Sequence, residues 1–380
     1  MVRLTTFELI HKIQKDENIN FIAFPLTPWA AHGVIAYINY LLDQGKAVRG
    51  FIGILKHPQA GYILSEKHFA SISQSALVQL FEFDRIDTQY IVEMQVAKSE
   101  MRRKCRQLYI LRQSAPDSRL IKKIKHFIPE IKIKNIILDE GLAMYMRSPM
   151  DWLSEHLAVT KSTKDKMKAV ICDIVYGPLM LRYLKTKDEL EYFSLFSKNK
   201  ITLEKNNQVC TFYAKAIRAS ANWIEESTKS IFDGAVVINT QPFYDNKEVF
   251  DDADLRVIEH IVNICNQHSI RPVLKLHPRE KTISRYDHLK CIVDQSQDIS
   301  QEALIANLEN KPKAIIGFSS TTLVSENVFE GIKTISMIKF IDSSNVCRSM
   351  QHDFRAFAET FYDYVLIPET WEEFEEYLST

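Results

Sequence analysis

Short apolar runs typical of buried strands alternate with helix-forming stretches along this chain, first between residues 20 and 141 and again between residues 234 and 337. The runs of the second series are GAVVINTQ, RPVLKLH, KAIIGF and KTISM. Parallel strands need long crossover connections, so this alternation is typical of a parallel sheet covered by helices on both faces. The sequence therefore predicts an α/β fold with two doubly wound, Rossmann-like domains.

The two series are separated by residues 150–230, where lysines, aromatic residues and helix formers dominate and strand patterns are few. A chain of 380 residues is also long for a single hydrophobic core. We therefore predict a first domain over residues 1–225, a second over residues 226–360, and a C-terminal helix over residues 361–380 that packs back on the first domain. Two such domains facing each other across a cleft place ligands outside the carboxyl ends of the strands.

Composition argues against several classes of protein. The formal net charge is zero, so no overall field favours a nucleic acid. The six cysteines include no Cys-x-x-Cys pair, which predicts free thiols in a reducing compartment and no zinc site. The N-terminus is charged throughout, unlike a signal peptide, and no apolar run reaches the roughly 20 residues that span a bilayer. We expect a cytoplasmic protein, either free or bound to the cytosolic surface of a membrane.

Two acids, Asp139 and Glu140, follow the apolar run NIIL directly and precede Gly141. Adjacent side chains at a strand end point to opposite sides, so one of the two carboxylates is expected to face a ligand. That carboxylate can act as a general base. The alternative is an acidic cap on the helix that follows.

The stretch RPVLKLHPREK carries Lys275 and His277 out of an apolar run, and Pro278 then ends the strand. Histidine titrates near neutrality, so beside a lysine it can protonate and stabilise a leaving phosphate. Arg279 adds a second cation nearby. The alternative is a hydrogen-bonded histidine at a strand edge.

A run of four hydroxyl residues, 319–322, follows the apolar strand IIGF and opens a helix that Gly331 closes. Free N–H groups and the helix dipole favour an anion at such a helix start, and the hydroxyls add donors without charge. An ordinary helix cap explains one hydroxyl but not four. The run therefore predicts a phosphate site.

Nucleotide-binding fingerprints of other kinds are missing: the chain has neither a Walker-type loop nor a GxGxxG stretch. The acids of DDAD, residues 251–254, suggest either a metal-binding pair or acids in the first turn of a helix. We favour the helix turn and predict no metal.

Three motifs occur in order along the chain: Asp139-Glu140-Gly141, Lys275-x-His277-Pro278 and Ser319-Ser320. This set resembles the motifs of bacterial CMP-sialic-acid-dependent sialyltransferases, with an acid-acid-Gly motif in the first domain and His-Pro and Ser-Ser/Thr motifs in the second. KLHPRE and GFSSTTL look particularly like the polysialyltransferases of glycosyltransferase family 38 and their relatives in family 52. The resemblance covers these motifs and the two-domain plan.

The resemblance implies a GT-B fold, inversion at the anomeric carbon, no metal or cofactor, CMP-sialic acid as donor and a glycan as acceptor. Glu140 is then the general base that deprotonates the acceptor hydroxyl, with Asp139 as the fallback, and His277 protonates the departing CMP phosphate. The donor-binding residues that it implies are Lys275, Pro278, Ser319, Ser320, Thr321 and, in the NTQPF loop, Gln241.

Residues 100–134 are rich in lysine and arginine. Three interpretations stay open: a basic groove for a polyanionic acceptor such as a growing sialic acid polymer, a contact with an anionic inner membrane or capsule-assembly complex, and a solvated helix face. The residues we expect in the groove are Arg102, Arg103, Lys122 and Lys123. Aromatic residues are sparse among these cations, which disfavours a nucleic acid.

Other functions fit part of the pattern. A transferase of CDP-glycerol type also uses a His-Pro motif and a Ser-Ser pair, and a Kdo transferase also uses a CMP-linked acidic sugar. The acidic motif at residues 139–141 favours sialyl transfer. A degenerate GT-B module that only binds an anionic glycan has no need of an acid and a base together.

Overall fold

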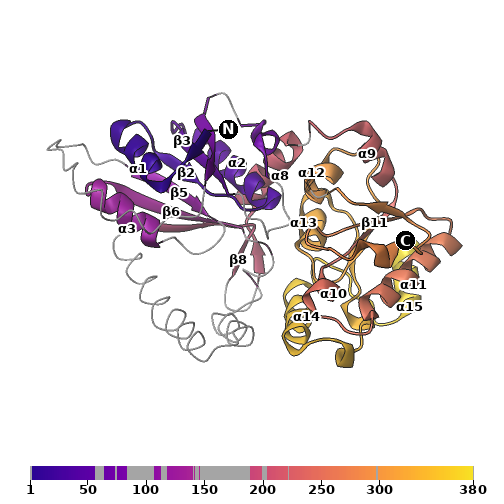
Figure 1. Cartoon of the computed structure of the whole chain (residues 1–380). Helices are drawn as coiled ribbons and strands as arrows, with labels where there is room; N and C mark the ends of the chain where they lie inside the picture. The colour runs from indigo at the N-terminus through magenta and orange to yellow at the C-terminus, as the bar shows by residue number, and fades with distance from the viewer. Residues whose placement is uncertain are drawn as a thin grey trace. The chain divides into compact units, whose positions relative to one another are not determined.

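The computed structural model describes residues 2–55, 64–72, 75–83, 107–112, 118–139, 141, 145, 189–198, 203–220, 222–296 and 298–379 (Figure 1). These residues form two compact units. The first contains the described residues up to Ala216 except Gly141 and Tyr145. The second contains those two residues and the chain from Ile217 onward. The basic residues Arg102 and Arg103 of the predicted groove lie outside the described residues.

The first unit is built on a seven-stranded sheet in which all described pairings are parallel. Its strands, in the order β1-β4-β3-β2-β5-β6-β7, are β1 (Val2–Leu4), β4 (Leu77–Phe83), β3 (Arg49–Leu55), β2 (Phe21–Ala23), β5 (Gln107–Arg112), β6 (Lys132–Leu138) and β7 (Glu189–Phe193). Its other elements are α1 (Thr6–Lys15), α2 (Pro28–Asp43), η1 (Glu66–Phe69), α3 (Ser118–Phe127), the hairpin β8 (Phe196–Lys198) and β9 (Leu203–Lys205), and α8 (Asn207–Ala219).

Helices cover both faces of this sheet. On one face α1 and α3 pack over a core that includes Ile22 and Ile110. On the other face α2 lies against the sheet, with the ring of Tyr37 5.0 Å from that of Phe193. The first unit is therefore doubly wound, as the alternation predicted.

The start and end of helix α2 follow from the residues at its ends. The side chain of Thr27 caps it by accepting a hydrogen bond from the N–H of Ala30, and Pro28 occupies the first turn, where its missing N–H costs no hydrogen bond. Gly45 follows the helix with φ +69°, a conformation that favours glycine. Eleven of the sixteen residues of α2 are buried, so the helix runs through the interior of the unit.

The second unit is built on a five-stranded sheet in the order β12-β11-β10-β13-β14, and all its pairings are parallel. The strands are β12 (Ile292–Asp294), β11 (Pro272–Lys275), β10 (Val236–Asn239), β13 (Ala314–Gly317) and β14 (Thr334–Ser336). The other elements are α9 (Glu226–Phe232), α10 (Phe243–Asn246), α11 (Ala253–Gln267), η4 (Ile283–Tyr286), α12 (Gln301–Ala306), α13 (Thr321–Glu330), η5 (Ile338–Phe340), η6 (Ser343–Asn345), α14 (Arg348–Phe361) and α15 (Trp371–Ser379).

Every residue of β10, β11 and β13 is buried, which explains why these strands read as continuous apolar runs. The strand order reverses at β10, because the chain passes from β10 to β11 and β12 on one side and to β13 and β14 on the other. Such a reversal is the usual ligand position in a doubly wound sheet. Both sheets confirm the predicted fold class of two Rossmann-like α/β domains, the type found in GT-B glycosyltransferases; their arrangement across a cleft stays a prediction.

The C-terminal helix α15 packs within the second unit. The ring of Trp371 lies 4.1 Å from that of His260 and 4.2 Å from that of Phe340, and Lys333 donates to the carbonyl of Tyr377 over 2.6 Å. Among the residues that the structure describes, no helix combines the length and the apolar character needed to cross a membrane.

Candidate functional site at the carboxyl ends of the second sheet

The carboxyl ends of β11, β10 and β13 bring three of the predicted segments to one edge of the second sheet. β10 pairs with β11 on one side and with β13 on the other, so the NTQPF loop lies between the His-Pro stretch and the hydroxyl run. The N–H of Thr240 donates to the carbonyl of Lys275 over 3.1 Å. The amide of Gln241 exchanges two hydrogen bonds with the backbone of Ser319, over 2.9 and 3.1 Å. Residues 35 and 78 positions apart in the sequence thus meet along one continuous edge.

The turn after β11 fixes the histidine. The N–H of Glu280 donates to the carbonyl of His277 over 2.9 Å, which closes a four-residue turn with Pro278 in its second position. The N–H of Arg279 donates to Nδ1 of His277 over 3.1 Å. A nitrogen that accepts a hydrogen bond carries no proton, so the neutral ring has its proton on Nε2. Burial, with the nearby charge of Arg279, lowers the pKa of His277 to about 3, so the ring is neutral at physiological pH.

A buried carboxylate, Glu280, holds this turn from behind. It accepts hydrogen bonds from the hydroxyl of Thr240, from the N–H of His277 over 3.0 Å and from the hydroxyl of Tyr286 over 2.6 Å. Burial raises the pKa of Glu280, and these bonds, together with the charge of Arg285, oppose the rise. Glu280 has no distinguishing signal in the sequence, because an acid after a His-Pro pair has the pattern of an ordinary solvated charge.

The lysine of the motif is buried in an ion pair. Nζ of Lys275 lies 2.7 Å from Oδ2 of Asp294 and 3.1 Å from the hydroxyl of Ser296, and only 7% of the residue is exposed. A buried pair of this kind needs its hydrogen bonds to offset the desolvation of two charges. Lys275 thus stabilises the end of β11 against β12, next to the His-Pro turn.

The hydroxyl run opens α13. The side chain of Ser320 caps the helix by accepting from the N–H of Thr322 over 3.3 Å, and Gly331 ends the helix with φ +64°. The first turn of α13 has no acidic residue, so no carboxylate of its own competes for the free N–H groups. Ser319 lies just before the cap, with its backbone held by Gln241.

A second buried acid without a distinguishing sequence signal, Glu302, connects α12 to α13. It lies in the first turn of α12, is 7% exposed, and accepts from the hydroxyl of Ser325 on α13 over 3.0 Å. Burial raises its pKa, while hydrogen bonds from Ser325 and Thr322 and the charge of Lys275 lower it. Its sequence signal is that of a capping acid after Ser300, so sequence alone does not distinguish the two roles.

Gly141 of the acidic motif lies against the hydroxyl run. Its φ is +92°, and a Cβ atom added to it would lie 2.6 Å from Oγ1 of Thr321. Both the backbone conformation and the lack of space therefore require glycine at this position. This gives a structural reason for the third residue of the motif.

Asp139, in the first unit, is 1% exposed at the end of β6. Oδ2 accepts from the N–H of Leu195 over 3.1 Å, and Oδ1 accepts from Nε1 of Trp29 over 3.4 Å. The N–H of Asp139 donates to the hydroxyl of Tyr213 over 3.3 Å. Asp139 therefore links β6 to three other segments of its unit: α2, the chain after β7, and α8. Glu140, the predicted base, lies outside the described residues.

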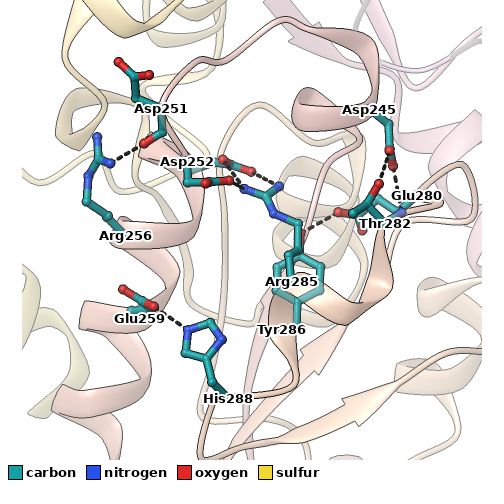
Figure 2. Close-up of polar contacts among 11 residues, drawn as sticks. Asp245, Asp251, Asp252, Arg256, Glu259, Glu280, Thr282, Arg285, Tyr286 and His288 are labelled. Carbon is teal, nitrogen blue, oxygen red and sulfur yellow. Dashed lines mark hydrogen bonds and ion pairs between the residues drawn. The ribbon is translucent and has the colours of Figure 1, made fainter.

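Two of the acids at residues 251–254, Asp252 and Asp254, bind an arginine. Arg285 donates two hydrogen bonds to Asp254, over 3.0 and 2.9 Å, and one to Asp252 over 2.8 Å (Figure 2). Its guanidinium also lies 4.5 Å from the ring centre of Tyr244. Asp254 is in the first turn of α11, the placement that the sequence favoured. Within the described part of the chain, no group of three or more His, Cys, Asp or Glu side chains is arranged to hold a metal ion.

The basic residues of the predicted acceptor groove are described only in part. Lys123 lies on α3, half-buried. The side chain of Lys122 is outside the described atoms, as are Arg102 and Arg103. The groove therefore stays a prediction.

Comparison with known proteins gives one family. The sequence model of the alpha-2,8-polysialyltransferase (POLYST) family matches residues 38–339, a range that includes all three motifs. No curated protein matches the chain. Solved structures of similar chain path include the alpha/beta-galactoside alpha-2,3-sialyltransferase of Photobacterium phosphoreum, with 13% identity, 92% of this chain and 98% of that chain covered, and a TM-score of 0.49.

Two further structures are similar at the same level. The sialyltransferase of Photobacterium damsela has 10% identity and a TM-score of 0.45, and the match covers 92% of this chain and 81% of that chain. The UDP-GlcNAc 2-epimerase of Methanocaldococcus jannaschii has 11% identity and a TM-score of 0.45, and the match covers 95% of this chain and 92% of that chain.

Proposed function

Because the chain belongs to the alpha-2,8-polysialyltransferase family, and is therefore a glycosyltransferase of the sialyltransferase kind, we propose that it transfers sialic acid from CMP-sialic acid to a glycan acceptor with inversion and without a metal. One observation carries the proposal for the donor. The His-Pro turn and the start of α13 lie on either side of the NTQPF loop, at the strand-order reversal of the second sheet.

The start of α13 supports binding of the donor phosphate. Its free N–H groups and dipole attract an anion, and the hydroxyls of Ser319 and Thr321 add neutral donors beside the Ser320 cap. Gln241 holds the backbone of Ser319 and so fixes the distance between the NTQPF loop and the helix start. These contacts favour a leaving group that carries a phosphate.

His277 supports departure of that phosphate. In the free protein its Nε2–H is a neutral hydrogen-bond donor. A bound phosphate brings negative charge next to the ring and raises its affinity for a proton. In the donor complex the ring therefore takes up a second proton, at Nδ1, and the imidazolium gives its Nε2 proton to the leaving oxygen, which returns the ring to its neutral form. The bond that breaks joins the anomeric carbon of sialic acid to the phosphate oxygen, and this oxygen takes the proton.

Glu302 and Lys275 support recognition of the nucleoside. The carboxylate of Glu302 is linked to α13 through Ser325, next to the predicted phosphate site, where it can accept hydrogen bonds from ribose hydroxyls. Lys275, fixed by Asp294 at the end of β11, places its charge near Glu302, and Pro278 follows in the His-Pro turn. The ring of Phe232 lies beneath Lys275, with Nζ 5.9 Å from its centre.

Glu140 is the proposed base. It removes the proton from the acceptor hydroxyl, whose oxygen then attacks the anomeric carbon from the face opposite the leaving phosphate. Asp139 is a poorer candidate, because it is buried and its two carboxylate oxygens accept from Leu195 and Trp29. The acid and the base then belong to different units of the chain.

For the acceptor we propose a sialylated glycan of capsule or lipooligosaccharide synthesis, held by the basic residues between positions 100 and 134. Their positive charge also suits the anionic cytoplasmic face of an inner membrane, where such a glycan is extended. A polyanionic acceptor makes binding sensitive to salt, because its charges are screened over about 10 Å at 0.1 M ionic strength.

A donor panel tests the proposal. The protein is incubated with CMP-sialic acid, CMP-Kdo, CDP-glycerol and UDP-GlcNAc, each with and without a sialylated oligosaccharide, and nucleotide release is measured. We expect slow release of CMP from CMP-sialic acid and faster release with the acceptor. If only CDP-glycerol or only CMP-Kdo were turned over, that compound and not CMP-sialic acid would be the donor. Binding of the glycan without turnover of any donor would indicate a binding module.

A further inference from the structure

The carboxylate of Glu280 lies behind His277, on the side of the turn that faces the protein interior. Its Oε2 atom is within hydrogen-bond distance of the hydroxyl of Thr240 and of the N–H of His277, while Oε1 accepts from the hydroxyl of Tyr286. Glu280 is 7% exposed. A carboxylate removed from water at this depth is costly unless donors surround it, and here three donors do so.

The same three donors connect separate elements of the unit. Thr240 follows β10, His277 follows β11, and Tyr286 ends the 3-10 helix η4. The hydroxyl of Thr240 also accepts from the N–H of His277 over 2.9 Å. The backbone of His277 is therefore held by two side chains, one of which comes from the neighbouring strand.

The far side of Glu280 is fixed as well. Tyr286 is fully buried and follows Arg285, whose guanidinium is bound by Asp252 and Asp254 at the start of α11. Asp245 accepts from the N–H and the hydroxyl of Thr282 and so fixes the segment between the turn and η4 (Figure 2). The turn that carries His277 thus has rigid attachments on both sides.

The ring of His277 has its own restraint, the bond from the N–H of Arg279 to Nδ1. This bond exists only while the backbone of the turn keeps its conformation, and that conformation is held by Glu280 and Thr240. Among the described residues, the charged groups near the turn include Arg279, whose charge acts on the ring, and Glu280, which accepts from the backbone of His277 and is itself influenced by Arg285.

We propose that Glu280 is a positioning residue that, together with Thr240, holds the His277 turn so that Nδ1 accepts from the backbone and the ring proton of the free protein lies on Nε2, aimed at the donor phosphate. The inference rests on the proposed function only for the identity of the phosphate. The tautomer and its dependence on Glu280 are properties of the free protein.

Nuclear magnetic resonance of the full chain tests the tautomer without any donor. Histidine is labelled with ¹⁵N, and His277→Ala identifies the His277 signals. We expect Nε2–H in the wild type from pH 5 to 8. In Glu280→Leu, which keeps the bulk but removes the acceptors, we expect a mixture of tautomers and a titration midpoint that moves up toward 6.5. The Nε2–H form with unchanged titration in Glu280→Leu would overturn the proposal.

Kinetic measurements with CMP-sialic acid are the second test of the positioning role. A misplaced ring costs about 10- to 100-fold in kcat with little change in KM, so we expect this loss in Glu280→Leu and in Thr240→Val. Glu280→Gln keeps one oxygen for Thr240 and His277 and can donate to Tyr286, so it should restore most of the rate. If neither the wild type nor any variant turned over the donor, the proposed function would be contradicted. The magnetic resonance result would then decide the positioning role of Glu280.

Thr334→Val is the matched control. Thr334 is also a buried threonine of the second unit, and its hydroxyl donates to the carbonyl of Tyr364 over 3.2 Å, away from the His-Pro turn. Both threonine substitutions remove one buried hydroxyl and should lower stability by a similar amount. Equal loss of kcat in the two variants would mean that activity follows stability, and the positioning role would be rejected.

Discussion

The backbone N–H of Arg279 and Nδ1 of His277 form a hydrogen bond of 3.1 Å inside a single turn. This bond decides which nitrogen of the ring carries the proton, and it leaves Nε2 as the donor. The position of the proton is therefore set by residues only two apart, while the position of the turn is set by Thr240, 37 residues earlier in the chain.

His277→Ala should lower kcat with CMP-sialic acid about 100-fold or more, because the leaving phosphate loses its proton donor. The bonds that close the turn use backbone atoms of residue 277, which alanine keeps, so the fold should persist. Steady-state release of CMP and circular dichroism check both points. His268→Ala, at an exposed histidine after α11, is the control. A similar loss of kcat in this variant would show that the effect is not specific to His277.

Glu140→Gln and Asp139→Asn should behave differently. The first should lower kcat about 100-fold with little change in Tm, as loss of a general base does. The second should mainly lower Tm, because an amide nitrogen would face the N–H of Leu195 or the indole of Trp29, and two donors cannot bond to each other. If Asp139→Asn instead lost activity at unchanged Tm while Glu140→Gln remained active, the base would be Asp139.

Stability should fall as the pH falls below about 6.5. Burial lowers the pKa of His32 to about 3, with a contribution from the charge of His68, and the pKa of His277 is lowered to about 3 as well. The unfolded chain therefore binds protons that the folded chain does not, between about pH 6.5 and pH 3. The stability is fully present above the unfolded pKa and is lost toward acid.

Each of these histidines contributes a slope of up to about 1.4 kcal/mol per pH unit in that range. Urea unfolding at pH 5, 6 and 7 measures it, and His32→Gln should reduce the slope. An unchanged slope in His32→Gln would show that His32 is not the buried neutral group that the fold indicates.

Gly141→Ala should destabilise the protein more than Gly331→Ala. Both glycines have positive φ, but the added methyl group meets Oγ1 of Thr321 only at Gly141, while nothing lies within 4 Å at Gly331. The backbone cost for alanine is about 1–2 kcal/mol at either site, so the difference between them measures the contact. Thermal unfolding of Gly141→Ala with and without Thr321→Ala completes the test, and the double variant should recover part of the loss.

Lys122→Glu combined with Lys123→Glu should weaken long polysialic acceptors more than short ones, and added salt should do the same to the wild type. The reason is that only a long polyanion reaches a groove beyond the site of transfer. KM for acceptors of two and of ten or more units, measured at low and at high salt, tests this. Equal effects on both lengths would indicate a solvated helix face.

Local signals in the sequence predicted much of the fold. Thr27, Pro28 and Gly45 mark the ends of α2 because capping and φ depend on neighbouring residues. The two parallel sheets followed from the alternation of strands and helices. Ser320 was predicted as part of a hydroxyl run and is the helix cap.

The parts that sequence did not reveal depend on distant residues. The structural role of Glu280 depends on its hydrogen bond with Thr240, 40 positions away. That of Glu302 depends on its hydrogen bond with Ser325, 23 positions away. Neither acid has a local pattern that separates it from a solvated charge. Asp139 shows the same limit, because the bonds that make it structural come from Trp29 and Leu195, 110 and 56 positions away.

The attachment of Glu280 to Thr240 has a consequence for the evolution of the family. One oxygen of the acid serves both the threonine hydroxyl and the histidine backbone, so neither residue can change alone without leaving a buried polar atom without a partner. Positions 240 and 280 should therefore vary as a pair among relatives. Position 279, whose hydrogen bond to the ring comes from the backbone N–H, is not bound to that pairing. A relative that replaces Glu280 alone marks a lineage in which His277 has lost its fixed orientation.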